Sequence, residues 1–371
     1  MMETKYVLVL SGGGFKGAFQ VGALEYIYEH GLSLPDGSRI IPEFCIVTGV
    51  SVGALNGALV ASGQFEELKK IWFQELANEG SDIIFTSKYI NHRGQVLFDN
   101  ITDDLLPPLN LKNILRLPFK KGRKKLLEEV LNKINNISSL ADNTPLYHKL
   151  KSLVRKEDFD RVKFRCGLVK FDNGRYYSVG PKDCPTDDDL ARAIQASATI
   201  PVVWSPIDEL SYKDTILRNT IDGGLRNNTP LSEAIDLINA EEKDSKYHIV
   251  IITNKPENLG SYQGNYSITK IAQRSLLEIT FDEIAFNDIN QFKLVNHLIR
   301  QVREEYPNAE LCDESGCALK EFDHTIITPV GEELGDMLDT SPNMIEERRR
   351  LGKLRARETI EDLRSSEDQS T

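Results

Sequence analysis

Two short glycine-rich segments near the start of the chain have the residue types and spacing that chemistry at a serine requires. The first, "GVSVG", places Ser51 between Gly49 and Gly53. A serine with this spacing sits on a sharp turn between a strand and a helix, and the two glycines remove side chains that would collide there. The helix that follows begins at the serine, so its dipole favours the negative charge that develops when the hydroxyl attacks a carbonyl.

The second segment, "SGGGFKG" over residues 11–17, is called the glycine loop here. Gly12, Gly14 and Gly17 fit the G-x-G-x-x-G spacing of a dinucleotide site. Such a site also needs an acidic residue at the end of the next strand, and that strand ends without one. Backbone N–H groups in a glycine-rich turn at a helix start also bind an oxyanion. Because both turns follow the first two strands of one predicted sheet, we expect them to meet at its C-terminal edge, where the loop forms an oxyanion hole for the serine.

A serine nucleophile needs a base, and the sequence offers two kinds. Asp222 ends a predicted strand and is followed by Gly223 and Gly224, so a flexible turn presents its carboxylate. An ordinary Asp-Gly turn is the alternative interpretation. A Ser-His-Asp hydrolase would instead use a later histidine, and the chain order allows His248, His297 and His324. None of the three has a supporting motif, so we favour Asp222 as the base.

The elements that must position these residues follow from the hydrophobic pattern. Strands are predicted over 5–10, 44–48, 216–221 and 247–253, a hairpin over 162–180, and helices over 18–30, 52–62, 66–78, 124–140 and much of the chain after 267. The uncharged stretch 44–63 is as long as a membrane span, but its small polar residues and central turn predict a strand and a helix instead. The opening β-α-β-α order predicts an α/β fold with a mainly parallel central sheet in three α/β/α layers, plus a helical C-terminal extension.

Composition narrows the function further. The 371 residues carry a net charge of −11, which argues against nucleic-acid binding. Five cysteines without paired spacing indicate neither a disulfide framework nor a zinc site, and we expect no cofactor or metal. No secretory signal is visible, so we expect a cytoplasmic protein.

Taken in order, the motifs resemble those of patatin-like phospholipases. "GGGFKG" resembles that family's oxyanion loop, "GVSVG" its nucleophile elbow and "DGG" its aspartate motif. "QASATIPVVWSP" from Gln195 and "NNTP" at 227–230 are similar to two further family segments, although Val203-Trp204 stands where a more aromatic pair is usual. The resemblance covers residues 6–236, and no family motif follows.

The resemblance implies hydrolysis of lipid acyl esters by a Ser-Asp dyad, without histidine and without metal. Ser51 would be the nucleophile and Asp222 the general base. The N–H groups of Gly13 and Gly14, together with Gly12, would hold the oxyanion, and Lys16 stands where the family usually has a basic residue. Two rivals remain, which are a non-catalytic scaffold that keeps the fold and a dinucleotide-binding enzyme. A regulated bacterial effector is a variant of the favoured interpretation.

The sequence also suggests how the chain is organised around this site. We expect a hydrolase core over 6–236, a continuation of the core with C-terminal helices over 237–340, and a charged peripheral tail over 341–371, in which the basic run 348–357 forms a solvated helix held by charge pairs. The stretch "RLPFKKGRKK" over 116–125 suits peripheral docking on an anionic membrane, with a solvated loop as the alternative. Its six basic residues are Arg116, Lys120, Lys121, Arg123, Lys124 and Lys125.

Overall fold

The computed structural model describes residues 4–34, 37–97, 138–241, 245–256, 274–309, 311–313, 318–330 and 334–368, with the single residues 100, 128, 132, 264, 266, 271 and 316. The predicted membrane-docking stretch 116–125 and most of the predicted helix 124–140 lie outside these residues.

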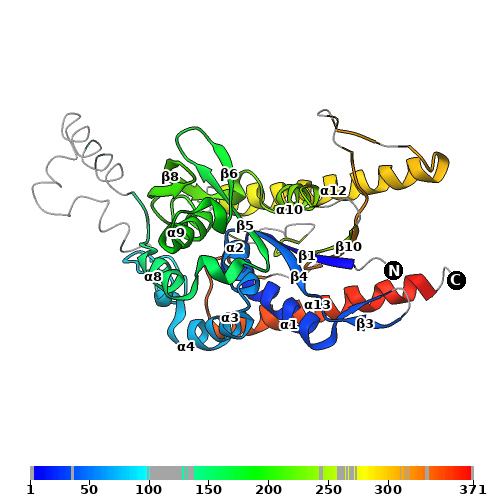
Figure 1. The fold of residues 1–371 in the computed structure, drawn as a ribbon. Coiled ribbons are helices and arrows are strands. Elements are labelled where there is room, and N and C mark those ends of the chain that lie inside the picture. The colour runs from blue at the N-terminus through cyan, green and yellow to red at the C-terminus, as the bar shows by residue number, and fades with distance from the viewer. Residues whose placement is uncertain are drawn as a thin grey trace, which may run out of the picture.

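One mixed sheet forms the centre of the molecule (Figure 1). Its strands are β1 (Thr4–Leu10), β4 (Phe44–Val50), β5 (Lys163–Lys170), β6 (Arg175–Val179), β7 (Ile207–Tyr212), β8 (Thr215–Asp222), β9 (Lys246–Ile252) and β10 (Asp323–Ile327). The order is β10-β9-β1-β4-β5-β8-β7, with β6 paired to β5. The five strands from β10 to β5 are parallel, whereas β6, β7 and β8 join by antiparallel pairing. A separate two-stranded sheet pairs β2 (Leu32–Ser33) with β3 (Arg39–Ile40).

Helices cover both faces of this sheet, which gives the expected three-layer α/β/α fold with a mainly parallel sheet (Figure 1). The α-helices are α1 (Ala18–His30), α2 (Val52–Ala61), α3 (Phe65–Lys70), α4 (Leu76–Glu79), α8 (Thr144–Leu153), α9 (Asp187–Ser197), α10 (Leu231–Asn239), α12 (Thr280–Glu305) and α13 (Pro342–Asp368). Shorter 3₁₀ turns are η1 (Gly14–Gly17), η3 (Gly80–Ile83), η4 (Lys156–Phe159), η5 (Pro181–Asp183) and η6 (Gly223–Leu225), while η2 (Ile71–Glu75) and η7 (Arg274–Ile279) are π-helical.

The side chains of the central strand β1 enter two hydrophobic cores, one on each face of the sheet. Tyr6, Leu8 and Leu10 point into the core beneath α1, α2 and α9, whereas Val7 and Val9 point into the second core beneath α10 and α12. Successive side chains of a strand alternate between faces, so a strand covered on both sides is apolar throughout.

Most predicted elements are confirmed. The stretch 44–63 divides into β4 and α2 as expected, and no helix of the described residues is long and apolar enough to cross a membrane. The predicted helix 66–78 contains the π-helical turn η2 between α3 and α4. The hydrophobic pattern missed β7 and β10, which are short strands at the two edges of the sheet.

The prediction of a peripheral tail is wrong for the part of 341–371 whose side chains are described. Helix α13 lies along α1 (Figure 1). Ile345, Leu351 and Ile360 are buried, and Gly22 of α1 lies so close that an added Cβ would be 2.1 Å from the Arg349 carbonyl oxygen.

The charge pairs expected in the same run are confirmed, with one exception. Arg350 pairs with Glu347 at 2.7 Å, while Arg349 pairs at 2.7 Å with Glu25 of α1 rather than only within its own helix. Arg348 is the exception, because its side chain is fully buried.

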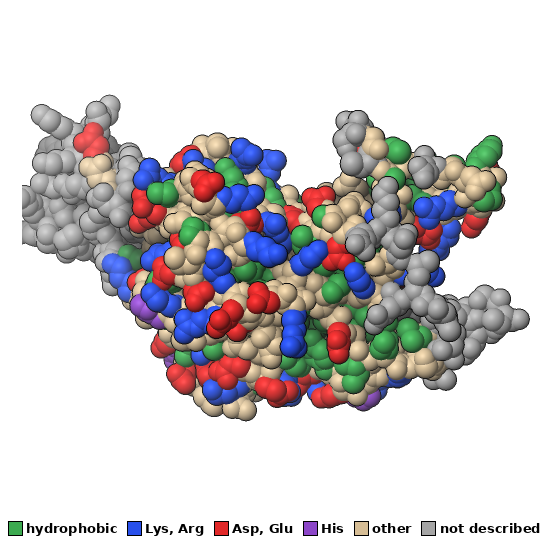
Figure 2. All heavy atoms as spheres, in the orientation of Figure 1, with side chains coloured by type: hydrophobic (Ala, Val, Ile, Leu, Met, Phe, Trp, Pro, Cys, Tyr) green, Lys and Arg blue, Asp and Glu red, His purple; other side chains and the backbone are tan. Residues whose placement is uncertain are grey.

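The charged surface of the molecule is mixed in sign. On the face drawn in Figure 2, blue basic and red acidic side chains are interspersed over the described part of the chain. The net negative charge is therefore not gathered into one acidic patch on this face.

Candidate active site

Ser51 occupies the turn between β4 and α2, as the glycine spacing predicts. Its φ of 57° and ψ of −129° are rare for a residue with a side chain and cost about 1–3 kcal/mol, which the surrounding packing must hold. A Cβ added to Gly49 would lie 2.1 Å from the Gly53 carbonyl oxygen, and one added to Gly53 would lie 2.3 Å from the Leu10 carbonyl oxygen. Both glycines are therefore required for the turn to pack against the end of β1.

The glycine loop lies directly against this turn. A Cβ added to Gly12 would lie 3.1 Å from the Cβ of Ser51. The Gly12 N–H donates to the backbone and side-chain oxygens of Asn228, at 3.0 and 2.9 Å, so it is not available to a substrate. Within the described chain the N–H groups of Gly13 and Gly14 have no acceptor. The geometry therefore leaves these two N–H groups open to a ligand.

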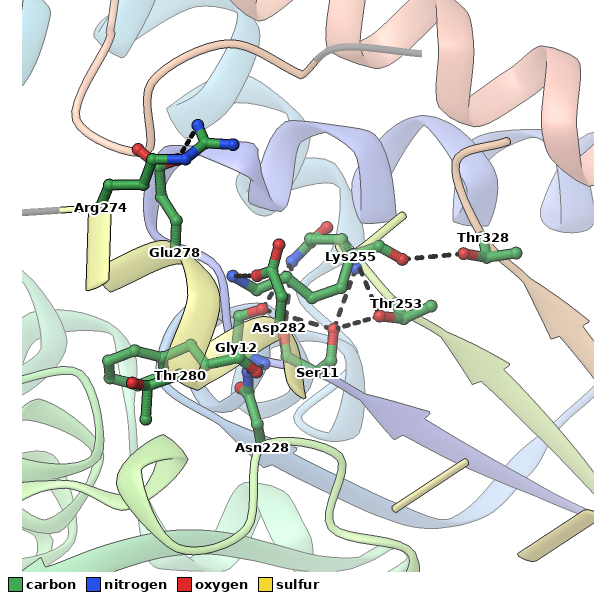
Figure 3. Close-up of polar contacts among 12 residues, drawn as sticks. Ser11, Gly12, Asn228, Thr253, Lys255, Arg274, Glu278, Thr280, Asp282 and Thr328 are labelled. Carbon is green, nitrogen blue, oxygen red and sulfur yellow. Dashed lines mark hydrogen bonds and ion pairs between the residues drawn. The ribbon is translucent and has the colours of Figure 1, made fainter. Parts of the chain in front are cut away.

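The start of the glycine loop is anchored to the end of β9 (Figure 3). The Ser11 hydroxyl lies 3.2 Å from the Thr253 hydroxyl and accepts the Asn254 N–H at 3.0 Å. Asn228 in turn donates from its side chain to the Phe281 carbonyl at 2.8 Å. Residues from three distant parts of the chain therefore fix the loop.

The other side of the loop is held by the C-terminal region, which the sequence analysis did not assign. The Phe15 N–H donates to the Met337 carbonyl at 2.8 Å. Arg348 of α13 donates to the Phe15 carbonyl at 3.1 Å and to the carbonyls of Leu334, Asp336 and Asp339. One buried guanidinium thus joins the segment 334–339 to the glycine loop.

Asp222 ends β8 and is completely buried. One carboxylate oxygen, Oδ1, accepts the Gly224 N–H at 2.7 Å, whereas Oδ2 has no hydrogen bond among the described residues. Burial raises the pKa of Asp222 to about 7, against the opposing effects of the Gly224 N–H, the Ser51 hydroxyl and the charge of Lys255. The carboxylate is therefore a desolvated base beside the serine, with one oxygen unoccupied.

Two residues of the segment "QASATIP" position the serine and the aspartate together. The Ser51 N–H donates to the Ser197 hydroxyl at 3.1 Å, and the Asp222 N–H donates to the Thr199 carbonyl at 2.9 Å. In the sequence this segment is recognisable only as a family motif, which assigns no role to Ser197 or Thr199.

An apolar cavity of about 80 Å³, partly open to solvent, is lined by Ser51 and Gly14. We call it the serine cavity. Among its lining residues are Val52, Leu55, Leu59, Leu150, Ile200 and Trp204. Of the described residues that line it, only Lys149 is charged, and Lys149 forms an ion pair with Glu75. Trp204 of the Val203-Trp204 pair lines the cavity, whereas Val203, the less aromatic member, is buried and is not among the lining residues. The cavity suits a hydrocarbon chain whose reacting group lies at the serine.

The basic residue of the glycine loop, Lys16, is buried, and burial lowers its pKa to about 8. The positive charges of Lys255 and Arg348 act in the same direction, and Asp282 acts against them. Lys255 itself forms a buried ion pair with Asp282 (Figure 3). Lys16 therefore lies behind the loop in a charged cluster.

The histidines that chain order allowed are not near the serine. His248 pairs with Tyr6 in the sheet, four residues or about 13 Å from the end of β1 that carries the glycine loop. Its Nε2 lies 2.8 Å from the Thr325 hydroxyl, His324 lies on neighbouring β10, and His297 is exposed on α12. Among the residues that the structure describes, no group of three histidine, cysteine or acidic side chains is suited to a metal ion.

A comparison with family models agrees with this geometry. The model of the patatin-like phospholipases matches residues 8–235, which is more than half of the chain. The chain belongs to this family. Its patatin-like part contains the glycine loop, Ser51 and Asp222, and it ends where the recognisable motifs end. Patatin-like phospholipases act on lipids, so this patatin-like chain is a member of a lipid hydrolase family.

Solved structures add only weak likenesses to this patatin-like chain. VipD from Legionella pneumophila is similar with a TM-score of 0.41 and 15% identity, covering 97% of this chain and 67% of that one. The complex of SpcU with ExoU from the type III secretion system of Pseudomonas aeruginosa gives 0.26 and 16%, covering 82% and 59%. Scores of this size carry no argument about function. No curated protein matches the chain.

Proposed function

We propose that this protein is a serine acyl hydrolase that cleaves carboxylic ester bonds of lipids, phospholipids among them, and releases free fatty acids. The observation that supports this most strongly is the buried Asp222 carboxylate beside the Ser51 hydroxyl, in which Oδ2 has no hydrogen bond among the described residues, while Ser51 lines an apolar cavity. None of these features is needed to bind a dinucleotide, so they do not support the dinucleotide-binding alternative.

The reaction follows from the placement of the groups. The Ser51 oxygen attacks the acyl carbonyl while Asp222 Oδ2 accepts its proton. The carbonyl oxygen becomes an oxyanion that the Gly13 and Gly14 N–H groups stabilise, with each such donor worth about 3 kcal/mol in the transition state. Asp222 then protonates the leaving alcohol, and the acyl chain stays in the serine cavity as an ester of Ser51. Water, deprotonated by the same aspartate, hydrolyses that ester and releases the fatty acid.

The pKa of Asp222 suits this role. A carboxylate with a pKa of about 7 is a much stronger base than a hydrated one, and about half of it is still deprotonated at pH 7. Burial of Asp222 supplies the basicity that a Ser-His-Asp triad takes from histidine.

The decisive assay measures fatty-acid release from mixed phospholipid and neutral-lipid vesicles with EDTA present. We expect the wild-type protein to release fatty acid, and we expect Ser51→Ala and Asp222→Asn to abolish release. Ser62→Ala, at the far end of α2, is the matched serine control and should act like the wild type. Loss of activity on changing His248, together with activity in Asp222→Asn, would contradict the dyad.

The scaffold hypothesis is tested separately with a serine-directed fluorophosphonate. Labelling of Ser51 supports a catalytic centre even when no lipid is cleaved, whereas an unlabelled wild-type protein that releases no fatty acid supports the scaffold. Membrane docking through 116–125 and a cytoplasmic location both remain predictions.

A further inference from the structure

A chain of buried amide side chains runs from the wall of the serine cavity to the glycine loop. It starts at Trp72, on the π-helical turn η2, whose indole N–H donates to Asn56 Oδ1 at 2.9 Å. Asn56 lies on α2, and both residues line the cavity. Single π-turns inside helices are frequently found at functional sites, so this wall is a place to look for a further role.

Asn56 connects Trp72 to the glycine loop through two hydrogen bonds of its side-chain amide. Its Nδ2 donates to the Gly17 carbonyl at 3.2 Å and to Gln20 Oε1 at 2.9 Å. Gln20 of α1 then donates through Nε2 to the Ser11 carbonyl at 2.8 Å. Ser11 and Gly17 are the two ends of the glycine loop, and the open N–H groups of Gly13 and Gly14 lie between them.

The chain is fully connected and shielded from water. Asn56 and Gln20 are completely inaccessible, and Trp72 is 5% exposed. Every oxygen and nitrogen of the two amide groups has a partner, which fixes their orientation. At the cavity wall, this chain begins with the Trp72 N–H of the π-helical turn.

Trp72 also contacts the loop directly. A Cβ added to Gly17 would lie 3.0 Å from a carbon of the Trp72 ring and 3.1 Å from Asn56 Nδ2. The Phe15 and Trp72 rings meet edge to face with centroids 6.3 Å apart. A shift of the Trp72 ring therefore reaches the loop through packing and through hydrogen bonds.

We infer that Asn56 is a positioning residue that links the cavity wall at Trp72 to the glycine loop, so that an acyl chain filling the cavity sets the oxyanion donors. This inference rests on the proposed function and adds regulation by acyl-chain length to it. An acetyl group fills only a small part of the cavity, so it leaves the Trp72 ring and the loop unbiased, whereas a long chain packs against the ring and holds the loop in the reactive arrangement. Chain length then changes kcat more than KM, because the effect lies in the transition state.

The kinetic test compares p-nitrophenyl acetate with p-nitrophenyl dodecanoate in the wild type and in Trp72→Phe. The phenyl ring keeps an apolar wall but cannot donate to Asn56. We expect the ratio of kcat for dodecanoate to kcat for acetate to fall about tenfold in the variant, as loss of one hydrogen bond implies. Phe73→Leu is the matched control, because Phe73 lies on the same turn with its ring 4.2 Å from the Arg349 guanidinium and does not line the cavity. An unchanged ratio in Trp72→Phe, or a change in KM alone, would overturn the inference.

A second measurement does not depend on turnover. Hydrogen exchange of the peptide covering residues 11–17 is measured with and without sodium dodecanoate. We expect dodecanoate to slow exchange of this peptide in the wild type and in Phe73→Leu but not in Trp72→Phe. Exchange that dodecanoate leaves unchanged in the wild type refutes the coupling. If dodecanoate slows exchange of this peptide in a protein whose Ser51 does not react with fluorophosphonate, that result supports the coupling and refutes the proposed hydrolase activity.

Discussion

Replacing the buried base by its neutral isostere should remove activity and raise stability at the same time. Asp222 has an ordinary pKa of 3.8 and a pKa of about 7 in the folded protein, raised chiefly by burial. Between pH 4 and pH 7 the folded protein keeps the Asp222 proton, whereas the unfolded chain has lost it. Stability therefore falls as pH rises through this window, by about 4 kcal/mol in all, and is constant above it.

The free energy of unfolding of Asp222→Asn lacks this pH dependence, so the variant should become more stable relative to the wild type as pH rises. Urea unfolding of both proteins gives the difference in the free energy of unfolding. We expect this difference to increase by about 3 kcal/mol between pH 5 and pH 8. The side-chain amide of asparagine adds a buried donor whose cost is the same at every pH, so it does not affect the increase.

The control for this experiment is Asp214→Asn, at an exposed position between β7 and β8. It should change the free energy of unfolding by less than about 0.5 kcal/mol at either pH. A difference between wild type and Asp222→Asn that is the same at pH 5 and pH 8 would refute the reasoning, because it would mean that Asp222 ionises without a burial penalty.

Three further outcomes follow from the site. The value of kcat/KM for a short ester should rise with pH with its midpoint near pH 7 and level off above about pH 8, because only deprotonated Asp222 accepts a proton; a midpoint near pH 4 would contradict this. Ser197→Ala leaves the N–H of the nucleophile buried without an acceptor and should slow fluorophosphonate labelling about tenfold, while Ser62→Ala should label at the wild-type rate. Arg348→Met strips the donor from four backbone carbonyls, two in buried and two in partly buried hydrogen bonds, and should lower the free energy of unfolding by at least about 3 kcal/mol in urea, whereas exposed Arg350→Met should lower it by less than about 1 kcal/mol.

Local patterns were enough to predict the parts of the site that local geometry dictates. The turn at Ser51 needs glycines two residues away on either side, and the glycine loop needs its own glycines for close packing, so both appear in the sequence as spacing. The edge of the sheet where they meet follows from β1 and β4 being adjacent and parallel. The roles of Ser51 and Asp222 in catalysis stay predictions that the assays above test.

Contacts between distant residues could not be predicted in this way. Ser197 lies 146 positions from Ser51, and Arg348 lies 333 positions from Phe15. The run around Arg348 is rich in charge, which is typical of a solvated helix, and most of it does form surface pairs. Nothing in that pattern distinguishes the one arginine that meets four backbone carbonyls in the interior. Likewise, only the folded structure shows that the Gly12 N–H donates to Asn228 and is therefore not available to a substrate.

The junction of α13 with the glycine loop has a consequence for the nascent chain. A ribosome produces the nucleophile and the base well before it reaches Arg348, so an incomplete polypeptide carries both groups without the guanidinium that holds the Phe15 carbonyl. We expect such a polypeptide to be inert towards lipid, and a protein cut after Ser341 to resist fluorophosphonate labelling. Lipolysis would then have to wait until the ribosome has synthesised α13.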